Sequence, residues 1–166
     1  MALAKILFAD PSKCTGCRAC ELVCSFVNKG VFNPARSNIT VITDEKNGVF
    51  IPIVCQQCDP APCMESCPTG ALYRNEQTWA VEVDKDKCIG CKLCVMACPL
   101  GAIKIDPSTG TSTKCNLCGG EPACVNYCRV KAILYIPEEQ AYYLRAREKA
   151  ESLIRIYKVA VGEAHV

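Results

Sequence analysis

The segment KCTGCRACELVC, residues 13–24, carries four cysteines with the spacing C-x2-C-x2-C-x3-C. The segment KCIGCKLCVMAC, residues 87–98, repeats that spacing. Two further groups have wider gaps, C-x2-C-x4-C-x3-C over 55–67 and C-x2-C-x5-C-x3-C over 115–128. These groups, motifs one to four in chain order, contain all 16 cysteines of the 166-residue chain. Such a cysteine content is typical of a disulfide scaffold, a zinc protein or an iron-sulfur protein, rather than of an ordinary hydrophobic-core enzyme.

Composition argues against several other classes. Lys and Arg total 19 against 17 acidic residues, and no run of like charge exceeds two, which argues against a nucleic-acid binder. The longest apolar runs are far shorter than the roughly 20 residues that cross a bilayer, and the first residues lack a signal-peptide pattern. We therefore expect a cytoplasmic protein without a membrane span. Because disulfides seldom persist in a reducing cytoplasm, metal-bound thiolates are favoured.

The spacing of motifs one and three has a physical reason in iron-sulfur proteins. Three thiolates on one tight backbone turn bind three irons of a cubane, and the fourth cysteine of such a run ligates the other cluster in two-cluster ferredoxins. Structural zinc usually takes two ligands from each of two separated turns, often with histidine, whereas this chain has one histidine, His165. We therefore predict iron-sulfur clusters, with each motif as half of a reciprocal pair, and keep zinc and disulfides as weaker alternatives.

An internal repeat extends beyond the cysteines. The segment 5–17 aligns with 79–91, and each copy predicts a short strand, a turn and a cluster loop. The matched residues are Asp10 with Asp84, Lys13 with Lys87, and Gly16 with Gly90. The segments CPTGALY, CPLGAIK and CRVKAIL, which start at the last cysteine of motifs two, three and four, each predict a small turn that leads into a strand. The pattern indicates two ferredoxin-like modules with two clusters each.

The order in which the motifs pair has two readings. Simple tandem order pairs motif one with two and three with four. Proline follows the last cysteine in motifs two and three, as Pro68 and Pro99, whereas Ser25 and Arg129 stand there in the outer motifs. This difference favours a nested order in which the two inner motifs pair with each other.

The stretch from Lys13 to Arg129 resembles the four-cluster ferredoxin family of electron-transfer subunits, which accompany molybdenum or tungsten oxidoreductases, hydrogenases and carbon monoxide dehydrogenases. The resemblance implies an α+β fold of two ferredoxin-like modules, one inserted in the other, and no catalytic centre. The outer module would comprise residues 1–53 and 107–136, the inserted module 54–106, and a helical tail 137–166. Some members lose one cysteine and hold a three-iron cluster; every ligand position here is cysteine, so we expect four 4Fe-4S clusters.

The resemblance also implies the ligands of each cluster. Cluster 1 would be held by Cys14, Cys17, Cys20 and Cys128, cluster 2 by Cys24, Cys115, Cys118 and Cys124, cluster 3 by Cys55, Cys58, Cys63 and Cys98, and cluster 4 by Cys67, Cys88, Cys91 and Cys94.

The segment between motifs one and two predicts a β-hairpin, because Asn47 and Gly48 stand between two β-rich runs. The segment CSFVNKGVFNPARSNI, residues 24–39, is similar to the equivalent stretch of small iron-sulfur subunits of tungsten-dependent aldehyde oxidoreductases. That resemblance implies a larger catalytic partner with a tungsten or molybdenum cofactor. Hydrogenase- and formate dehydrogenase-linked relatives are the alternative.

The tail from Pro137 predicts a helix of about twenty residues, because Pro137 lies at its start, Glu138 and Glu139 fall in its first turn and Lys158 lies near its end. Its apolar residues recur at steps of three and four, which indicates one apolar stripe. The stripe comprises Tyr143, Ala146, Ala150, Leu153, Ile154, Tyr157 and Val161. Either it folds back on its own module or it docks on a catalytic subunit or a second copy of the chain. Some relatives form conducting filaments through such helices.

No catalytic pattern accompanies the cysteines, since the sequence has no phosphate loop or nucleophile motif and His165 stands one residue from the end. The predicted function is one-electron transfer. A free-standing ferredoxin is the main alternative, and a redox sensor without a DNA-reading element is a more distant one.

Overall fold

The computed structural model describes residues 4–160. Within them the strands form four two-stranded antiparallel sheets. The pairs are β1 (Lys5–Ala9) with β8 (Ile133–Pro137), β2 (Thr40–Asp44) with β3 (Val49–Ile53), β4 (Leu72–Arg74) with β5 (Val81–Val83), and β6 (Ile103–Ile105) with β7 (Ser112–Lys114).

Short helices carry the cysteine motifs. They are α1 (Ala19–Lys29), α2 (Pro62–Glu65), α3 (Leu93–Ala97) and α4 (Ala123–Asn126), and a longer helix, α5 (Glu138–Ala160), follows β8. Single 3-10 turns occur at η1 (Pro11–Lys13), η2 (Pro34–Arg36) and η3 (Leu117–Gly120). Each of the helices α1–α4 contains the third cysteine of its motif, namely Cys20, Cys63, Cys94 and Cys124. The mixture of helices with small antiparallel sheets agrees with the expected α+β class.

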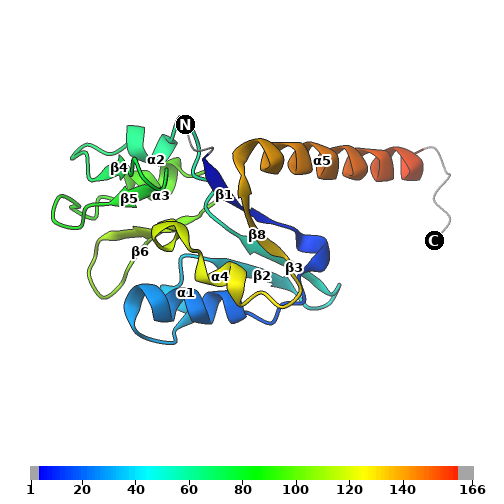
Figure 1. Cartoon of the computed structure of the whole chain (residues 1–166), viewed down its shortest axis with the longest axis horizontal. Coiled ribbons are helices and arrows are strands. Elements are labelled where there is room, and N and C mark those ends of the chain that lie inside the picture. The colour runs from blue at the N-terminus through cyan, green and yellow to red at the C-terminus, as the bar shows by residue number, and fades with distance from the viewer. Residues whose placement is uncertain (1–3, 161–166) are drawn as a thin grey trace.

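The two ends of the chain share one part of the molecule. Strand β1 pairs with β8 near the other end of the described chain, with Leu7 opposite Tyr135, and α1 packs against α4. The middle of the chain forms a second group, in which α2 packs against α3 beside the β4–β5 pair. Figure 1 shows this separation: the green elements α2, α3, β4 and β5 lie together, while the blue α1 and the yellow α4 lie on the other side.

Local predictions from the sequence hold. The hairpin around Asn47 and Gly48 is confirmed as β2–β3, with Thr40 opposite Ile53. Gly48 has a left-handed φ of 66° in its turn, a conformation that glycine adopts without steric cost. The turns after the last cysteines of motifs two, three and four lead into β4, β6 and β8, as predicted.

The hydrophobic core consists largely of cysteines and aliphatic side chains. The largest cluster joins buried cysteines of motifs one, two and four to Leu7, Ile39, Leu117 and Ile133. A second cluster, around Leu72, Val81 and Ile103, packs against cysteines of motifs two and three. The residues that carry sulfur therefore lie inside the packed interior rather than in surface loops alone.

Helix α5 is confirmed, but its packing face differs from the predicted stripe. Ala141 is fully buried and Leu144 is partly buried against Ile6 and Phe8 of β1. The stripe residues Tyr143 and Leu153 are 68% and 55% exposed, so the stripe does not fold back on its own module. Helical periodicity identified an apolar face, whereas the covered face is set by the short connection from β8. Val161 of the stripe lies outside the described residues.

Beyond its first turns, α5 extends away from the rest of the molecule (Figure 1). In the part of the chain that the structure describes, no helix combines the length and apolarity needed to cross a membrane.

A buried ion-pair network joins the two groups of elements. Asp106, in the loop after β6, lies 2.9 Å from Lys29 Nζ at the end of α1 and 3.1 Å from Arg36 Nη2. Burial on its own would raise the pKa of Asp106, but hydrogen bonds from Arg36, Lys29 and Ser108 hold it well below its usual range. A depressed carboxyl pKa stabilises the fold at every pH above the unfolded-state pKa, so the contribution is complete at neutral pH.

We predict that Asp106→Asn lowers the free energy of unfolding by about 3–5 kcal/mol, because it leaves two cations without their buried carboxylate. The measurement is the urea midpoint of the anaerobic protein at pH 7. Asp84→Asn is the matched control, since Asp84 pairs with the exposed Lys87 at 3.3 Å, and exposed pairs contribute little. Equal midpoints for the two variants would contradict the prediction.

Candidate iron-sulfur centres

All four motif loops turn at the same place. The second residue after the first cysteine has a left-handed backbone in each motif: Gly16, Gln57, Gly90 and Leu117, with φ between 51° and 69°. A Cβ on Gly16 would collide with the ring of Phe50, and one on Gly90 with the carbonyl oxygen of Gly110. Motifs one and three therefore require glycine at this position, both for the turn and for the close approach of neighbouring atoms.

Motifs two and four make the same turn without glycine. A left-handed residue with a Cβ costs roughly 1–2 kcal/mol, so the surroundings must hold it in place. Leu117 is fully buried in the main core. Gln57 is 1% exposed, and its side chain donates to the Cys115 carbonyl and accepts from Val81 N and Lys114 Nζ.

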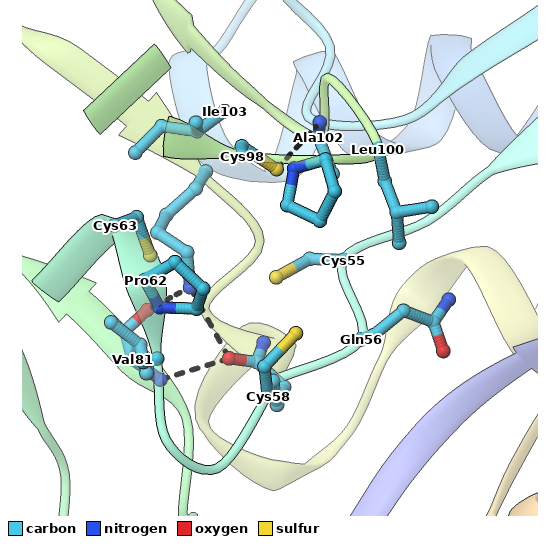
Figure 2. Close-up of a pocket in the computed structure, with 14 residues that line it drawn as sticks. Cys55, Gln56, Cys58, Pro62, Cys63, Val81, Cys98, Leu100, Ala102 and Ile103 are labelled. Atoms are coloured by element: carbon cyan, nitrogen blue, oxygen red, sulfur yellow. Dashed lines mark hydrogen bonds between the residues drawn. The ribbon is translucent and has the colours of Figure 1, made fainter. Parts of the chain in front are cut away.

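One pocket brings together cysteines of two different motifs. It is lined by Cys55, Cys58 and Cys63 of motif two and by Cys98, the last cysteine of motif three. Figure 2 shows the four sulfurs pointing into the same space. The remaining lining is mostly apolar and includes Pro62, Val81 and Ile103. The backbone N–H of Ala102 donates to Cys98 Sγ at 3.4 Å.

A second pocket repeats this composition with the outer motifs. Cys14, Cys17 and Cys20 of motif one line it together with Cys128, the last cysteine of motif four. The N–H of Ala132 donates to Cys128 Sγ at 3.2 Å, in the position equivalent to the bond from Ala102 to Cys98. The two pockets thus have matching sulfur sets and matching backbone donors.

The last cysteine of motif one lies among the cysteines of motif four. Burial raises the pKa of Cys124 above its usual range, and the charges of Cys24 and Cys118 raise it further. Burial likewise raises the pKa of Cys115, to which the charges of Cys124 and Cys24 also contribute. Cys24, Cys115 and Cys124 also belong to the largest core cluster, which brings the last cysteine of motif one together with motif four.

The last cysteine of motif two lies beside motif three. Ser112 Oγ is 3.1 Å from Cys88 Sγ and 3.5 Å from Cys94 Sγ, and the Ser112 N–H donates to Cys88 Sγ at 3.3 Å. Burial opposes the ionisation of Cys88, but these hydrogen bonds lower its pKa, while the nearby charge of Cys67 acts in the opposite direction. Cys91 of the same motif is exposed.

The chemistry of these donors fits 4Fe-4S clusters. All 16 cysteines are free of disulfides in the structure, which disagrees with the disulfide reading. Burial raises the pKa of Cys20 to about 12, so such thiols ionise only when a cation compensates the charge, as iron does. Within residues 4–160, no three His, Cys, Asp or Glu side chains converge as a single metal ion requires. Sulfurs around a pocket suit a larger group of atoms.

Two polar residues beside the sulfurs were missed by sequence reasoning. Lys114 is buried and lines the pocket of Cys55 and Cys98. Ser112 contacts two sulfurs of motif three. A signal for Lys114 was present: the lysines before motifs one and three have an aspartate three residues earlier, whereas Thr111 stands there before Lys114.

Two family models match the chain. The model described as a 4Fe-4S dicluster domain matches residues 46–138, and one described as a 4Fe-4S binding domain matches residues 11–27. The first match spans motifs two to four and the second lies over motif one. Together the two matches include all 16 cysteines, and both models describe 4Fe-4S binding.

Two relatives are described as subunits of redox enzymes. The chain is 44% identical over 122 residues to the aliphatic sulfonate oxidoreductase, polyferredoxin-like subunit, of Pyrococcus furiosus, covering 74% of this chain and 70% of the relative. It is 37% identical over 143 residues to the thiosulfate reductase electron transfer subunit PhsB of Salmonella typhi, covering 78% and 74%. A chain of the active site complex BamBC of benzoyl coenzyme A reductase aligns with a TM-score of 0.49 and 26% identity, over 81% of this chain and 76% of that chain.

We predict that Ser112→Ala lowers the reduction potential of one cluster by some tens of millivolts. For comparison, a tenfold change in a one-electron equilibrium constant corresponds to about 59 mV. The reason is the loss of the Ser112 hydroxyl, which lies 3.1 Å from Cys88 Sγ and would donate to that sulfur as an iron-bound thiolate, since hydrogen bonds to sulfur stabilise the reduced cluster. The measurement is an EPR-monitored redox titration. Ser66→Ala is the control, because Ser66 Oγ donates to the Cys63 carbonyl and not to a sulfur. A Ser112→Ala titration that overlays the wild type would refute the prediction.

Proposed function

Because the chain belongs to the 4Fe-4S dicluster family of ferredoxin-type electron-transfer subunits, we propose that it holds four 4Fe-4S clusters and relays electrons for a catalytic oxidoreductase subunit, without catalysing a reaction itself. A 4Fe-4S cluster held by these thiolates would supply one-electron redox chemistry. The protein contributes the thiolates, the backbone donors to sulfur and the apolar lining that limits water.

The proposal assigns the clusters to four crossed sets of cysteines. They are Cys14, Cys17, Cys20 and Cys128; Cys24, Cys115, Cys118 and Cys124; Cys55, Cys58, Cys63 and Cys98; and Cys67, Cys88, Cys91 and Cys94. The observation that carries this assignment is the pair of pockets in which three cysteines of one motif meet the last cysteine of another. It implies an outer module of residues 1–53 and 107–136 around an inserted module of residues 54–106.

Contacts between the sets support a linear order of clusters 1 to 4. Cys20 of the first set acts on Cys124 of the second, and Cys55 of the third set acts on Cys115 of the second. The third and fourth sets draw their cysteines from the same two motifs. In this order the electron crosses between modules beside Cys55 and Cys115.

We propose that the catalytic partner is a larger redox enzyme. The named relatives are subunits of a sulfonate oxidoreductase and a thiosulfate reductase, which supports a larger redox enzyme as the partner. The resemblance of residues 24–39 favours a tungsten or molybdenum enzyme of the aldehyde oxidoreductase kind. A hydrogenase or formate dehydrogenase partner, or a free-standing polyferredoxin, is the alternative. Anaerobic co-purification tests this, because a subunit brings a larger metalloenzyme with it. The expected cytoplasmic location belongs to the same proposal.

The crossed sets make a prediction that single substitutions cannot test. Cys55→Ala with Cys98→Ala removes two ligands of one cluster, so the chain should lose one cluster, about four irons. Cys55→Ala with Cys67→Ala removes one ligand from each of two clusters, so it should lose up to two. The measurement is anaerobic native mass spectrometry, with iron and sulfide content.

Clusters held within single motifs give the reverse outcome, because Cys55 and Cys67 would then share a cluster and Cys55 and Cys98 would not. A wild-type chain with fewer than four clusters would contradict the cofactor proposal itself.

We propose that the exposed stripe of α5 binds the catalytic subunit. Leu153, Ile154 and Tyr157 are 55%, 55% and 66% exposed, whereas Ala141 and Leu144 attach the helix to β1. Tyr143 and Ala150 lie on the same stripe and are also exposed. The membership of the relatives in enzyme complexes supports a catalytic subunit as the occupant, and a second copy of the chain, as in a filament, is the alternative.

Removing residues 149–166 should weaken binding to the catalytic subunit at least tenfold and leave the iron content unchanged, because Ala141 and Leu144 remain. The measurement is anaerobic pull-down together with light scattering. Arg147→Gln is the control, since Arg147 is an exposed helix residue that pairs with Glu151. A drop in the mass of the isolated chain would identify a second copy as the occupant instead. Unchanged binding and mass would rule out both.

A further inference from the structure

A buried lysine crosses from one module to the other. Lys114 ends β7 directly before Cys115, yet its Nζ donates to the Val81 carbonyl at 2.6 Å and to Gln57 Oε1 at 3.2 Å. Residue 114 is 5% exposed. It lines the pocket of Cys55, Cys58, Cys63 and Cys98, which Figure 2 shows. Lys114 therefore lines the same pocket as the four sulfurs.

The equivalent lysines of the repeat are placed differently. Lys13 and Lys87 also stand directly before the first cysteine of a motif, but their side chains are 54% and 63% exposed and pair with Asp10 and Asp84. At the position of those aspartates the fourth motif has Thr111. The lysine before the first cysteine is thus exposed and paired with an aspartate in motifs one and three, but buried in motif four.

Among the residues that the structure describes, Lys114 forms no ion pair with a carboxylate. The two hydrogen-bond acceptors of its Nζ are an amide oxygen and a carbonyl oxygen. Arg74, the other cation near this loop, donates to the carbonyls of Gln57 and Cys58 and lies 3.8 Å from Asp59. Cys63, another residue of the pocket, has its pKa raised by burial, and the charge of Lys114 acts to lower it.

We propose that Lys114 is a positioning residue whose fixed charge raises the reduction potential of the cluster at Cys55, Cys58, Cys63 and Cys98, an inference that rests on the proposed function. The oxidised cluster with its four thiolates has a net charge of about −2, and one electron makes it about −3. A buried cation stabilises the more negative state, and low local polarity strengthens this effect. The step moves one electron from a neighbouring cluster, or from dithionite in a titration, with no bond made or broken and no proton taken up.

The place of Lys114 gives this effect a consequence for the relay. Cys115, its neighbour in sequence, belongs to the second set, and Cys55 of the third set lies close to Cys115. A higher potential at the cluster on the far side of the module boundary would favour transfer of an electron from the outer module to the inner one.

The test is an EPR-monitored redox titration of the holoprotein. Lys114→Met should weaken the reduction of one of the four clusters at least tenfold in its equilibrium constant. This corresponds to a potential lower by about 59 mV for one electron. Lys114→Arg, which keeps the charge, should leave that potential close to the wild type. Lys13→Met and Lys87→Met are the matched controls, because their lysines hold the same place in the repeat and are exposed. If Lys114 only holds Gln57 and Val81 together, the potentials will be unchanged in every variant. That result would overturn the proposal.

A second variant leaves the lysine in place. Gln57→Glu puts a carboxylate on the same ammonium group and should lower the same potential, so it answers the question if Lys114→Met fails to bind iron. In the Cys55→Ala, Cys98→Ala background, which should lose the cluster concerned, Lys114→Met should shift none of the remaining potentials; a shift there would assign the lysine to another cluster. Iron content separates the two hypotheses: a wild-type chain without four clusters contradicts the proposed function, whereas four clusters with an unmoved potential contradict only the role of Lys114.

Discussion

The last cysteine of each motif constrains the rest of the structure. Three cysteines of a motif lie on one loop and helix, but the fourth stands where another motif needs it, as Cys98 does beside motif two and Cys128 beside motif one. The helices of paired motifs must therefore pack together, which α1 does with α4 and α2 with α3. The four small sheets then close the outside of these pairs. The sulfur positions thus determine which distant parts of the chain become neighbours.

Buried charge joins the two groups of elements. Asp106 binds Lys29 and Arg36 from the segment after motif one, and Lys114 extends in the opposite direction to Gln57. Charged groups are costly to bury without partners. Each of these two residues therefore needs hydrogen-bond or ion-pair partners from the other group of elements. The contact between the two groups of elements is therefore specified by hydrogen bonds and ion pairs as well as by apolar packing, which favours one relative orientation over many.

Local patterns were enough to predict the motif loops, the β2–β3 hairpin and the extent of α5, because spacing, a turn dipeptide and helical periodicity act over a few residues. The left-handed turn at Gln57 was not predictable in this way, since its partner Cys115 lies 58 positions away. The covered face of α5 was also missed: periodicity finds apolar residues, but Ala141 rather than the larger Tyr143 fits against β1. What the sequence did not reveal depends on tertiary contacts.

The pairing of β1 with β8 also bears on how the chain is made. Strand β1 is synthesised among the first residues, but its partner is complete only at Pro137. In the proposed cysteine sets, every ligand of the inner module leaves the ribosome before Cys115 does, whereas both outer sets include a cysteine of motif four. The inner sets are therefore complete in a shorter nascent chain than the outer sets, and the assembly order that the proposal implies runs from the inside outwards.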